Sequence, residues 1–413
     1  MSAAKVSHGV TETRREDSAS VRTSAVPSLR FKGFESAWIS KELLEIVTFG
    51  KGRGYSKSDI KESGTPLFLY GRMYTAFQNE VASVDTFANA VEGSVLSKGK
   101  EVVVPASGET AEDIARASAI TSEGIILGGD LNVLTPKNGV DINSVFLALV
   151  LSYGRARKQI EVRAQGKTVV HVHNTDLAEV MPSYPVCLDE QEKIQIGFRN
   201  VDTALLSRQS ALAKLQALKK SMLVNMFPQG DAKVPKIRFK GFEGEWKEVG
   251  YPDIFDHIPS KRYQIQSSEY QECGAFPVLD QGKECVCGYS DNEYRVFRGS
   301  AKPVVIFGDH TREVKFADFD FVVGADGTQL LAPKKMDSLF AYYLLSHLTI
   351  PNMGYSRHFK FVVDAVFQCP EDILEQRKIA AYFKSLDRLI AARRDEIEQL
   401  KHMKAALLNR MFV

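Results

Sequence analysis

Two stretches of the chain carry the apolar spacing of long amphipathic helices. In residues 190–227, and again in 375–412, apolar residues recur at alternating steps of three and four, which is the heptad seam of a coiled coil. Polar residues fill most other positions, so each helix has one apolar stripe to bury. We predict a helix–helix seam formed by Ile194, Phe198, Val201, Leu205, Leu212, Leu215, Ile379, Phe383, Leu386, Ile390, Ile397 and Leu400.

Both seams are interrupted by basic residues at matching places. Arg208 corresponds to Arg393, and Lys219 corresponds to Lys404. Matched polar breaks can set the register and orientation of a helix pair at some cost in stability. Long basic side chains that lie along the seam edge with their charges in water explain the pattern equally well.

The two helical stretches belong to a larger internal repeat. They align without a gap, with 12 identities in 38 positions, and the segments 27–38 (PSLRFKGFESAW) and 235–246 (PKIRFKGFEGEW) share 8 of 12. The bodies between these segments, 39–189 and 247–374, resemble each other little, and the first is 23 residues longer. The chain therefore contains two modules, each with a constant frame and a variable body. Such modules can dock in the same way through the frame and recognise different targets through the body.

The relative direction of the helices follows from their length. A 38-residue helix is roughly 57 Å long at 1.5 Å per residue. A globular body of about 140 residues is only ~35–40 Å across, so it cannot easily carry the chain back along a parallel helix. We predict an α+β fold with two globular domains joined by two long antiparallel coiled-coil helices, shaped as a pseudo-two-fold dumbbell with the C-terminus beside the first body.

Five segments are expected along the chain. The polar residues 1–26 lack the apolar core of a signal peptide and are expected to be a disordered tail. The other segments are a first globular domain over 27–189, a central helix over 190–227, a second globular domain over 228–374 and a C-terminal helix over 375–413.

Composition excludes several classes of protein. The chain is 44% hydrophobic and 25% charged, and it has no run of 18 apolar residues that would cross a membrane, so we expect a cytoplasmic protein. The 53 basic and 51 acidic residues give a net charge of +2, which does not by itself indicate nucleic-acid binding. The five cysteines are scattered without zinc spacing, and we expect free thiols and no metal site.

Local clusters of basic and aromatic residues predict a DNA-binding surface. Arginine and lysine contact phosphates and guanine edges, and tyrosine adds hydrogen bonds to phosphates. A solvated surface role explains any single member equally well, so the clusters carry the argument together. The predicted DNA-binding residues are Lys51, Arg53, Tyr55, Lys57, Arg72, Tyr74, Arg155, Arg157, Lys158 and Lys167 in the first body, and His310, Arg312, Lys315, Tyr355, Arg357, His358 and Lys360 in the second.

The repeated motifs resemble those of a known family. The PxxRFKGFExxW segments, the EQxKI helix starts and the helices ending in Met-Phe are similar to those of the specificity (S) subunit of Type I restriction–modification enzymes. Stretches inside the bodies, such as GRGYSKSDI (52–60), FGDHTREVKF (307–316) and GYSRHFK (354–360), also resemble that family's target recognition domains. The polar N-terminal extension departs from the family pattern.

The resemblance implies a recognition subunit without catalysis of its own. Each body would be a target recognition domain that reads one half of a bipartite site in double-stranded DNA, and the helices would fix the spacer and dock the partners. Two modification (M) subunits would supply S-adenosylmethionine-dependent adenine methylation, and restriction (R) subunits would supply ATP- and Mg²⁺-dependent translocation and cleavage. No cofactor is expected in this chain, and no membrane partner.

Two alternatives remain open at this stage. In the first, this single chain combines recognition with DNA methylation or cleavage. However, the loop FGKGRG (49–54) is not followed by the apolar helix of a cofactor site, and the chain has no Pro-Pro of an adenine methyltransferase turn. In the second, the chain is a coiled-coil adaptor that does not bind DNA.

Overall fold

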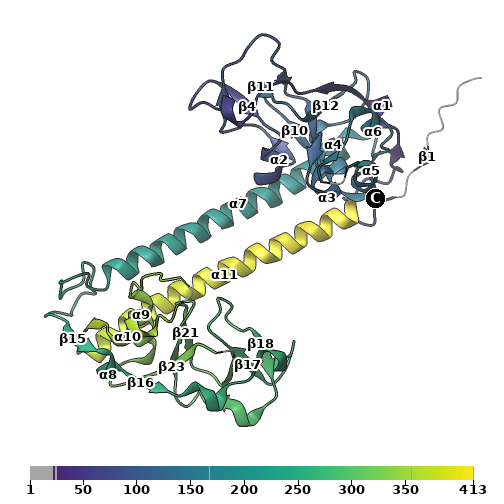
Figure 1. Ribbon diagram of the computed structural model, residues 1–413. Coiled ribbons are helices and arrows are strands. Elements are labelled where there is room, and N and C mark those ends of the chain that lie inside the picture. Colours follow the sequence, from purple (N-terminus) through teal and green to yellow (C-terminus); the bar gives the residue numbers. More distant parts are fainter. Residues whose placement is uncertain (1–21, 24–25, 167, 325, 355, 413) are drawn as a thin grey trace, which may run out of the picture. The chain divides into compact units, whose positions relative to one another are not determined.

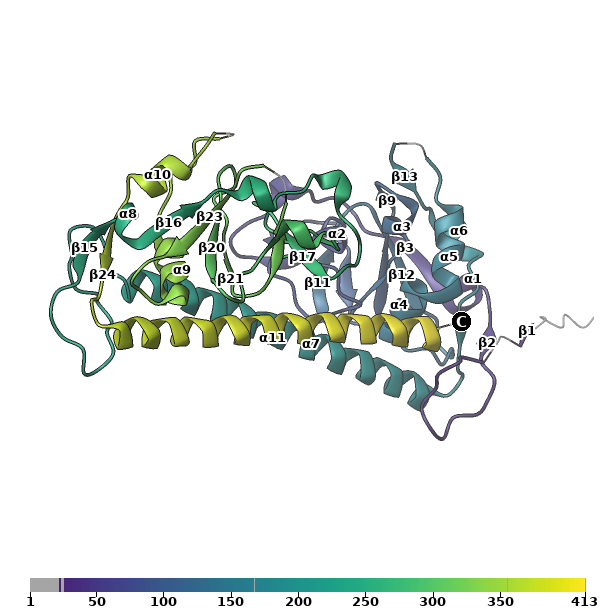
Figure 2. The same cartoon turned by 90° about the horizontal axis from the view of Figure 1, so that it is seen from below.

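A computed structural model describes residues 22–23, 26–166, 168–324, 326–354 and 356–412. The predicted tail therefore lies outside the described residues except for Arg22–Thr23 and Val26. The chain divides into two compact units. The first unit comprises the described residues of Met1–Leu206 and Glu398–Val413, and the second comprises those of Ser207–Ile397. Each unit is described by itself below (Figures 1 and 2).

The first unit contains two sheets of four or more strands. The larger has the order β3-β12-β8-β10-β5, and the smaller has the order β6-β4-β11-β7. The strands of the first are β3 (Val47–Lys51), β12 (Leu131–Pro136), β8 (Glu101–Pro105), β10 (Ser118–Ile120) and β5 (Glu80–Val81); those of the second are β6 (Phe87–Ala88), β4 (Thr65–Phe68), β11 (Glu123–Leu127) and β7 (Leu96–Lys98). Smaller sheets join β1 (Arg22–Thr23), β2 (Ile39–Ser40) and β14 (Ser183–Tyr184), and β13 (Val170–His171) with β9 (Ser107–Gly108).

The second unit repeats this plan with fewer strands. One sheet has the order β16-β23-β20-β21 and another has the order β18-β17-β22-β19. Their strands are β16 (Phe255–Ile258), β23 (Thr328–Pro333), β20 (Val304–Gly308) and β21 (Val314–Ala317), then β18 (Gly288–Ser290), β17 (Phe276–Leu279), β22 (Phe321–Val323) and β19 (Val296–Phe297). A two-stranded sheet pairs β15 (Lys247–Gly250) with β24 (Val366–Cys369).

The two units share one topology although their bodies differ in sequence. In the sheets β6-β4-β11-β7 and β18-β17-β22-β19, the central strands are parallel, β4 with β11 and β17 with β22, and both outer pairings are antiparallel. A helix covers the other main sheet of each unit, α4 (Ser144–Ser152) over β8 and β10, and α9 (Ser338–His347) over β20 and β21. The sequence-divergent bodies are therefore two versions of one fold.

The other helices are short except for two. The short α-helices are α1 (Leu43–Ile46), α2 (Arg72–Thr75), α3 (Ala111–Ile114), α5 (Gly154–Arg163), α6 (Asn174–Ala178), α8 (Tyr251–Ile254) and α10 (Phe359–Val363), and 3-10 turns occur at Lys57–Asp59, Ser260–Tyr263, Ser267–Glu269 and Glu293–Arg295. The long helices are α7 (Leu188–Asn225) and α11 (Ile373–Met411). The predicted α+β fold with two long helices is confirmed.

An ion pair joins each copy of the PxxRFKGFExxW segment to the start of a long helix in the same unit. Arg30 donates to both carboxylate oxygens of Glu190, with Nη2 to Oε2 at 2.7 Å, and Arg238 donates to both oxygens of Glu375 at 2.8 Å. Both glutamate side chains are only 1% exposed. These hydrogen bonds raise the pKa of each arginine above its ordinary value. The arginine of PxxRFKGF and the glutamate of EQxKI are thus the two halves of one buried ion pair.

The glutamine that follows this glutamate in the EQxKI motif makes a second repeated contact. Gln191 Oε1 accepts from the backbone N–H of Asn143, and Gln376 Oε1 accepts from that of Asp337, at 2.8 and 2.9 Å. Asn143 and Asp337 are the N-caps of α4 and α9. The repeated glutamine therefore ties the long helix to α4 in the first unit and to α9 in the second.

The last aromatic residue of each helical repeat packs in the core of a unit. Phe412 contacts Phe146, Tyr153 and Phe198 in the first unit, with ring centroids 5.8–6.2 Å apart. Phe227 contacts Trp246, Phe340, His347 and Phe383 in the second unit, at 5.0–6.1 Å. The pairs Phe412–Phe198 and Phe227–Phe383 are equivalent in the repeat. The core of each unit is therefore completed by the end of the helix that begins in the other, and the C-terminus lies in the first unit as predicted.

Ion pairs between α7 and α11 show that the helices are antiparallel within each unit. In the first unit Lys404 pairs with Asp202 at 2.6 Å, and α11 continues toward Phe412 as α7 runs back toward Phe198. In the second unit Lys219 pairs with Asp387 at 2.6 Å and Arg208 with Glu396 at 3.2 Å. Three of the basic breaks in the seam, Arg208, Lys219 and Lys404, thus pair with acids on the facing helix, whereas Arg393 pairs with Glu396 of its own helix.

Burial of the seam residues is highest near the units' cores. Ile194, Phe198, Ile379, Phe383, Leu386, Ile390 and Ile397 are buried, and Val201, Leu205, Leu212, Leu215 and Leu400 are half-buried. A two-helix contact without further layers leaves one side of each side chain near water, which accounts for the half-buried set.

Candidate nucleic-acid interface

A rigid turn at the end of β3 presents basic side chains of the first unit. The backbone N–H of Gly52 donates to Leu131 O, and that of Arg53 donates to Leu127 O, at 2.9 and 3.1 Å. A Cβ at position 52 would collide with the carbonyl oxygen of Gly128, so this approach requires glycine. Lys51 and Arg53 are exposed, and neither side chain has a hydrogen-bond or ion-pair partner among the described residues. The turn thus fixes the backbone beneath two cations available to a ligand.

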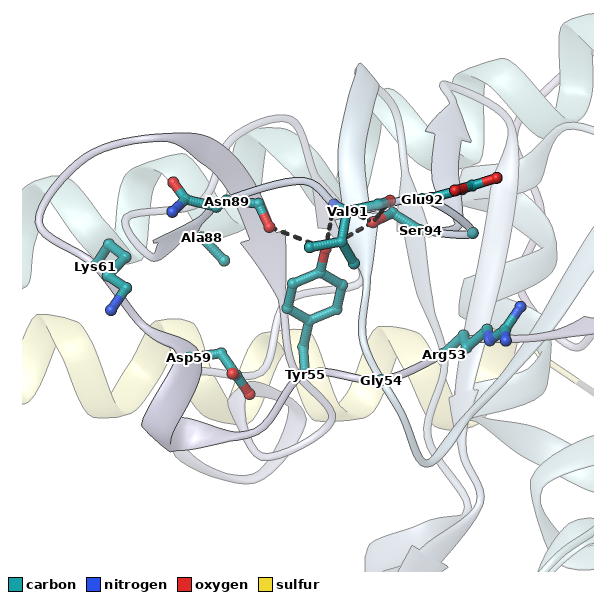
Figure 3. A pocket seen from close by; sticks show the side chains of 11 residues that line it. Arg53, Gly54, Tyr55, Asp59, Lys61, Ala88, Asn89, Val91, Glu92 and Ser94 are labelled. Carbon is teal, nitrogen blue, oxygen red and sulfur yellow. Dashed lines mark hydrogen bonds between the residues drawn. The ribbon is translucent and has the colours of Figure 1, made fainter.

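Tyr55 joins this turn to a neighbouring loop. Its hydroxyl lies 2.6 Å from Ser94 Oγ, donates to Asn89 O and accepts from Val91 N–H, both at 3.1 Å. The ring lines a cleft of about 450 Å³ whose charged side chains are Arg53, Asp59, Lys61 and Glu92. Figure 3 shows the Arg53 guanidinium pointing away from the tyrosine ring. Tyr55 therefore bridges the turn to residues 89–94, and the side chains of Arg53 and Lys57 are exposed.

Arg72 and Tyr74 are used inside the first unit. Arg72 pairs with Asp85, and the Tyr74 hydroxyl donates to Ser107 O at 2.6 Å. Burial raises the pKa of Tyr74 to about 12, so the hydroxyl stays protonated. The guanidinium of Arg116, which the sequence analysis missed, lies 5.2 Å from the Tyr74 ring centroid. Only packing reveals Arg116, because no aromatic residue lies next to it in the sequence.

A second basic group of the first unit lies on α5. Arg155 and Lys158 are exposed, and Arg157 pairs with Glu161 at 2.7 Å. They line a hollow of about 380 Å³ together with Asn409 and Phe412 of the chain's C-terminal end. This hollow is separate from the Tyr55 cleft, so the structure does not bring the two basic groups of the first body into one site.

In the second unit the described predicted residues lie on the turn between β20 and β21, on β21 itself, on the loop before α10 and on α10, and they differ in exposure. Arg357 and Lys360 are exposed, whereas His358 is fully buried. Lys315 Nζ donates to the carbonyl oxygens of Asp280 and Glu284, and its side chain is 9% exposed. A buried imidazole and an internally bonded ammonium support the loops, and we assign these two residues to that role.

Two other predicted residues of these loops also have internal contacts. Arg312 is half-buried at φ +65° and donates to Ile350 O at 3.3 Å, and His310 Nδ1 lies 3.2 Å from Ser356 O. Beside them, His257 Nε2 lies 2.8 Å from Gln329 Oε1 on adjacent strands, a polar pair that the sequence analysis missed. Lys167 and Tyr355 lie outside the described residues.

Other chemistry finds little support in the described part of the chain. No group of three or more His, Cys, Asp or Glu side chains there could hold a metal ion. None of the described helices is long and apolar enough to cross a membrane. All five cysteines, which are within the described residues, are free thiols.

The chain therefore consists of two units of one topology, each with exposed arginine and lysine side chains beside its sheets. No protein-family model matches the chain. It is 29% identical over 111 residues to the specificity subunit of the Type I restriction enzyme EcoR124I/EcoR124II from Escherichia coli. That match covers 26% of this chain and 27% of the relative, about a quarter of its length.

The fold comparison extends over nearly the whole chain. The crystal structure of the Type I restriction–modification S subunit from M. genitalium matches with a TM-score of 0.64 and 16% identity, covering 94% of this chain and 99% of that one. A structure that describes complex assembly and conformational transition of a type I system matches with a TM-score of 0.53 and 17% identity, covering 91% and 97%. The resemblance to Type I specificity subunits is confirmed, and the fold is theirs.

Proposed function

We propose that this chain is the sequence-recognition subunit of a Type I restriction–modification complex. Each unit reads one half of a bipartite site in double-stranded DNA, and the helices set the spacer between the halves. One observation carries the proposal: the same architecture occurs twice on a repeated frame, while the residues exposed on its turns differ. A shared fold with different exposed residues suits two modules that contact the same polymer and read different base pairs.

The partners supply the chemistry in this proposal. Two M subunits bring S-adenosylmethionine, R subunits bring ATP and Mg²⁺, and the complex acts in the cytoplasm. Several apolar side chains on the long helices are exposed in this chain alone, among them Leu206, Leu218, Leu389 and Met403 at 38–58%. Large apolar side chains that remain uncovered on a helix commonly mark a protein–protein contact. We assign the docking of the M subunits to these outer helix faces.

Purified protein separates this proposal from its two alternatives. The chain alone should bind duplex DNA with an affinity that falls steeply with salt, because basic side chains displace counterions. It should transfer no methyl group from labelled S-adenosylmethionine and cleave no DNA with Mg²⁺ and ATP. Activity without partners would support the single-chain enzyme, and binding without salt dependence would support the adaptor. No observation in the structure favours either alternative.

Arg53→Ala and Arg357→Ala are expected to change DNA binding while leaving the fold intact. Both side chains are exposed, so the free energy of unfolding should change by less than about 0.5 kcal/mol. If the lost contact is to a base, about 1–3 kcal/mol of discrimination disappears at one position. If it is to phosphate, affinity falls for all sequences and the salt slope becomes shallower by about one. Titrations with matched and substituted duplexes make the distinction, and unchanged binding by both variants would reject these turns as contact surfaces.

Deleting residues 235–374 is expected to abolish recognition of one half-site and to make the remainder dimerise. The deletion removes Trp246 and Phe340, which cover Phe227, and leaves the apolar Phe227, Ile379 and Phe383 without their core. A second copy can bury these exposed residues. Light scattering and site selection from random duplexes check the outcome. A monomer that still selects the full bipartite site would contradict the proposal.

A further inference from the structure

The turn between β20 and β21 in the second unit holds a carboxylate that is nearly inaccessible to water. Asp309 is 2% exposed, and it follows directly on the five buried residues of β20. A carboxylate in such a place needs polar partners to compensate for its lost hydration. Its partners therefore indicate what the residue is for.

Most partners of Asp309 come from the loop that precedes α10. Oδ1 accepts from the backbone N–H of Phe359 at 2.8 Å. The carbonyl oxygen of Asp309 accepts from the backbone N–H of His358 at 2.8 Å and lies 3.0 Å from His358 Nδ1. His358 Nε2 accepts from the backbone N–H of Met353 at 3.3 Å. Since Nε2 accepts, Nδ1 carries the proton and donates to the Asp309 carbonyl. The loop is thus fastened to the turn at three places.

The second carboxylate oxygen is directed to an exposed arginine on that loop. Asp309 Oδ2 lies 4.0 Å from Arg357 Nε, and the Arg357 side chain is 73% exposed. The buried carboxylate is fixed by its backbone contacts, so its negative charge attracts the guanidinium from one side while leaving the outer nitrogens open. An arginine whose position is biased in this way loses less rotamer freedom on binding than an unbiased one.

We propose that Asp309 is a positioning residue that orients Arg357 to recognise a G·C base pair in the second half-site. The planar guanidinium can donate two parallel hydrogen bonds to O6 and N7 of guanine in the major groove. This inference rests on the proposed function, because it names how the second unit discriminates one base pair. In the first unit the glycine turn fixes only the backbone of Arg53, and no carboxylate among the described residues pairs with its side chain, so the first half-site serves as an internal reference.

The test compares full-length variants on duplexes that carry the target, as defined by mapping methylated adenines in the host. Each base pair of either half-site is replaced in turn, and affinities are measured at two salt concentrations. Asp309→Asn keeps an oxygen that accepts from Phe359 but removes the charge that faces Arg357. Glu371→Gln is the matched control, because it removes the carboxylate of an exposed ion pair with Lys247 in the same unit. Thermal unfolding is followed for each variant.

Asp309→Asn is expected to lower discrimination at one G·C pair of the second half-site by roughly 5- to 150-fold, with the first half-site unaffected. Arg357→Ala should lose discrimination at the same pair, and the double variant should lose no more than Arg357→Ala alone, because Asp309 acts through Arg357. A purely structural role for Asp309 would instead weaken all base pairs of the second half-site together. That result, or full discrimination by Asp309→Asn, would overturn the inference.

Arg357→Lys tests the same pair without altering the buried carboxylate. It keeps the positive charge and so the salt slope, but a lysine lacks the planar fork, and discrimination at the G·C pair should fall. Full discrimination by Arg357→Lys would also overturn the inference. If the unaltered protein prefers no duplex sequence, the proposed function itself fails, and this outcome is distinct from selective binding that the variants leave unchanged.

Discussion

Glu375→Ala is expected to lower the free energy of unfolding of the second unit by about 3–5 kcal/mol. The Glu375 side chain is 1% exposed and accepts two hydrogen bonds from Arg238, whose own side chain is 15% exposed. Removing one partner of such a pair leaves the other charge buried without compensation. The first unit should keep its stability, because its own pair, Arg30 with Glu190, is untouched.

Native-state hydrogen exchange measures this loss unit by unit, which a single melting curve of a two-unit protein does not. Glu371→Ala is the control, because its ion pair with Lys247 in the same unit is exposed on both sides, at 64% and 69%. An exposed pair of this kind contributes ~0–1 kcal/mol. Glu190→Ala should reproduce the effect in the first unit. A loss as small as that of the control would mean that the repeated Arg–Glu pair does not hold the frame.

Lengthening both long helices by seven residues is expected to enlarge the unread spacer of the target by roughly three base pairs. Seven residues preserve the heptad phase and add about 10.5 Å at 1.5 Å per residue, and duplex DNA rises roughly 3.4 Å per base pair. The ion pairs Asp202–Lys404 and Arg208–Glu396 place the insertions after Leu205 and after Leu400, which face each other in the first unit. The half-site sequences should remain the same, because neither binding turn changes.

Methylation-site mapping of the lengthened protein, assembled with its modification subunits, reports the spacer directly. Bending or twisting of the DNA can absorb part of the change, so affinity should fall even as the preferred spacing moves. Inserting two residues is the control, since it rotates the seam by about 200° and should destabilise the helix pair. An active complex with an unchanged spacer would show that the helices do not set the distance.

The structure shows that the predicted DNA-binding residues differ in exposure, which the sequence does not reveal. Lys51, Arg53 and Arg357 are exposed. The polar groups of His358, Lys315 and Tyr74 instead form hydrogen bonds within their own units. A basic or aromatic residue in a loop has the same local sequence signature whether it faces solvent or the next loop. These polar groups contact backbone carbonyl oxygens that lie 31 to 49 positions away, and such contacts leave no pattern in the sequence. DNA contact by the exposed residues stays a prediction.

The sequence by itself determined the frame: two long helices, the repeated entry segment and the internal duplication. Helix periodicity is a local pattern, and the two copies of the helical repeat align without a gap, so both features can be recognised along the chain. Only the tertiary structure decided that the two divergent bodies share one sheet topology, because pairings such as β4 with β11 and β17 with β22 join strands far apart in sequence. It also decided that Arg30 meets Glu190 across 160 positions and Arg238 meets Glu375 across 137. Both members of each pair are repeated in the sequence. Only the structure shows that the two charges are buried together, which accounts for why both are repeated.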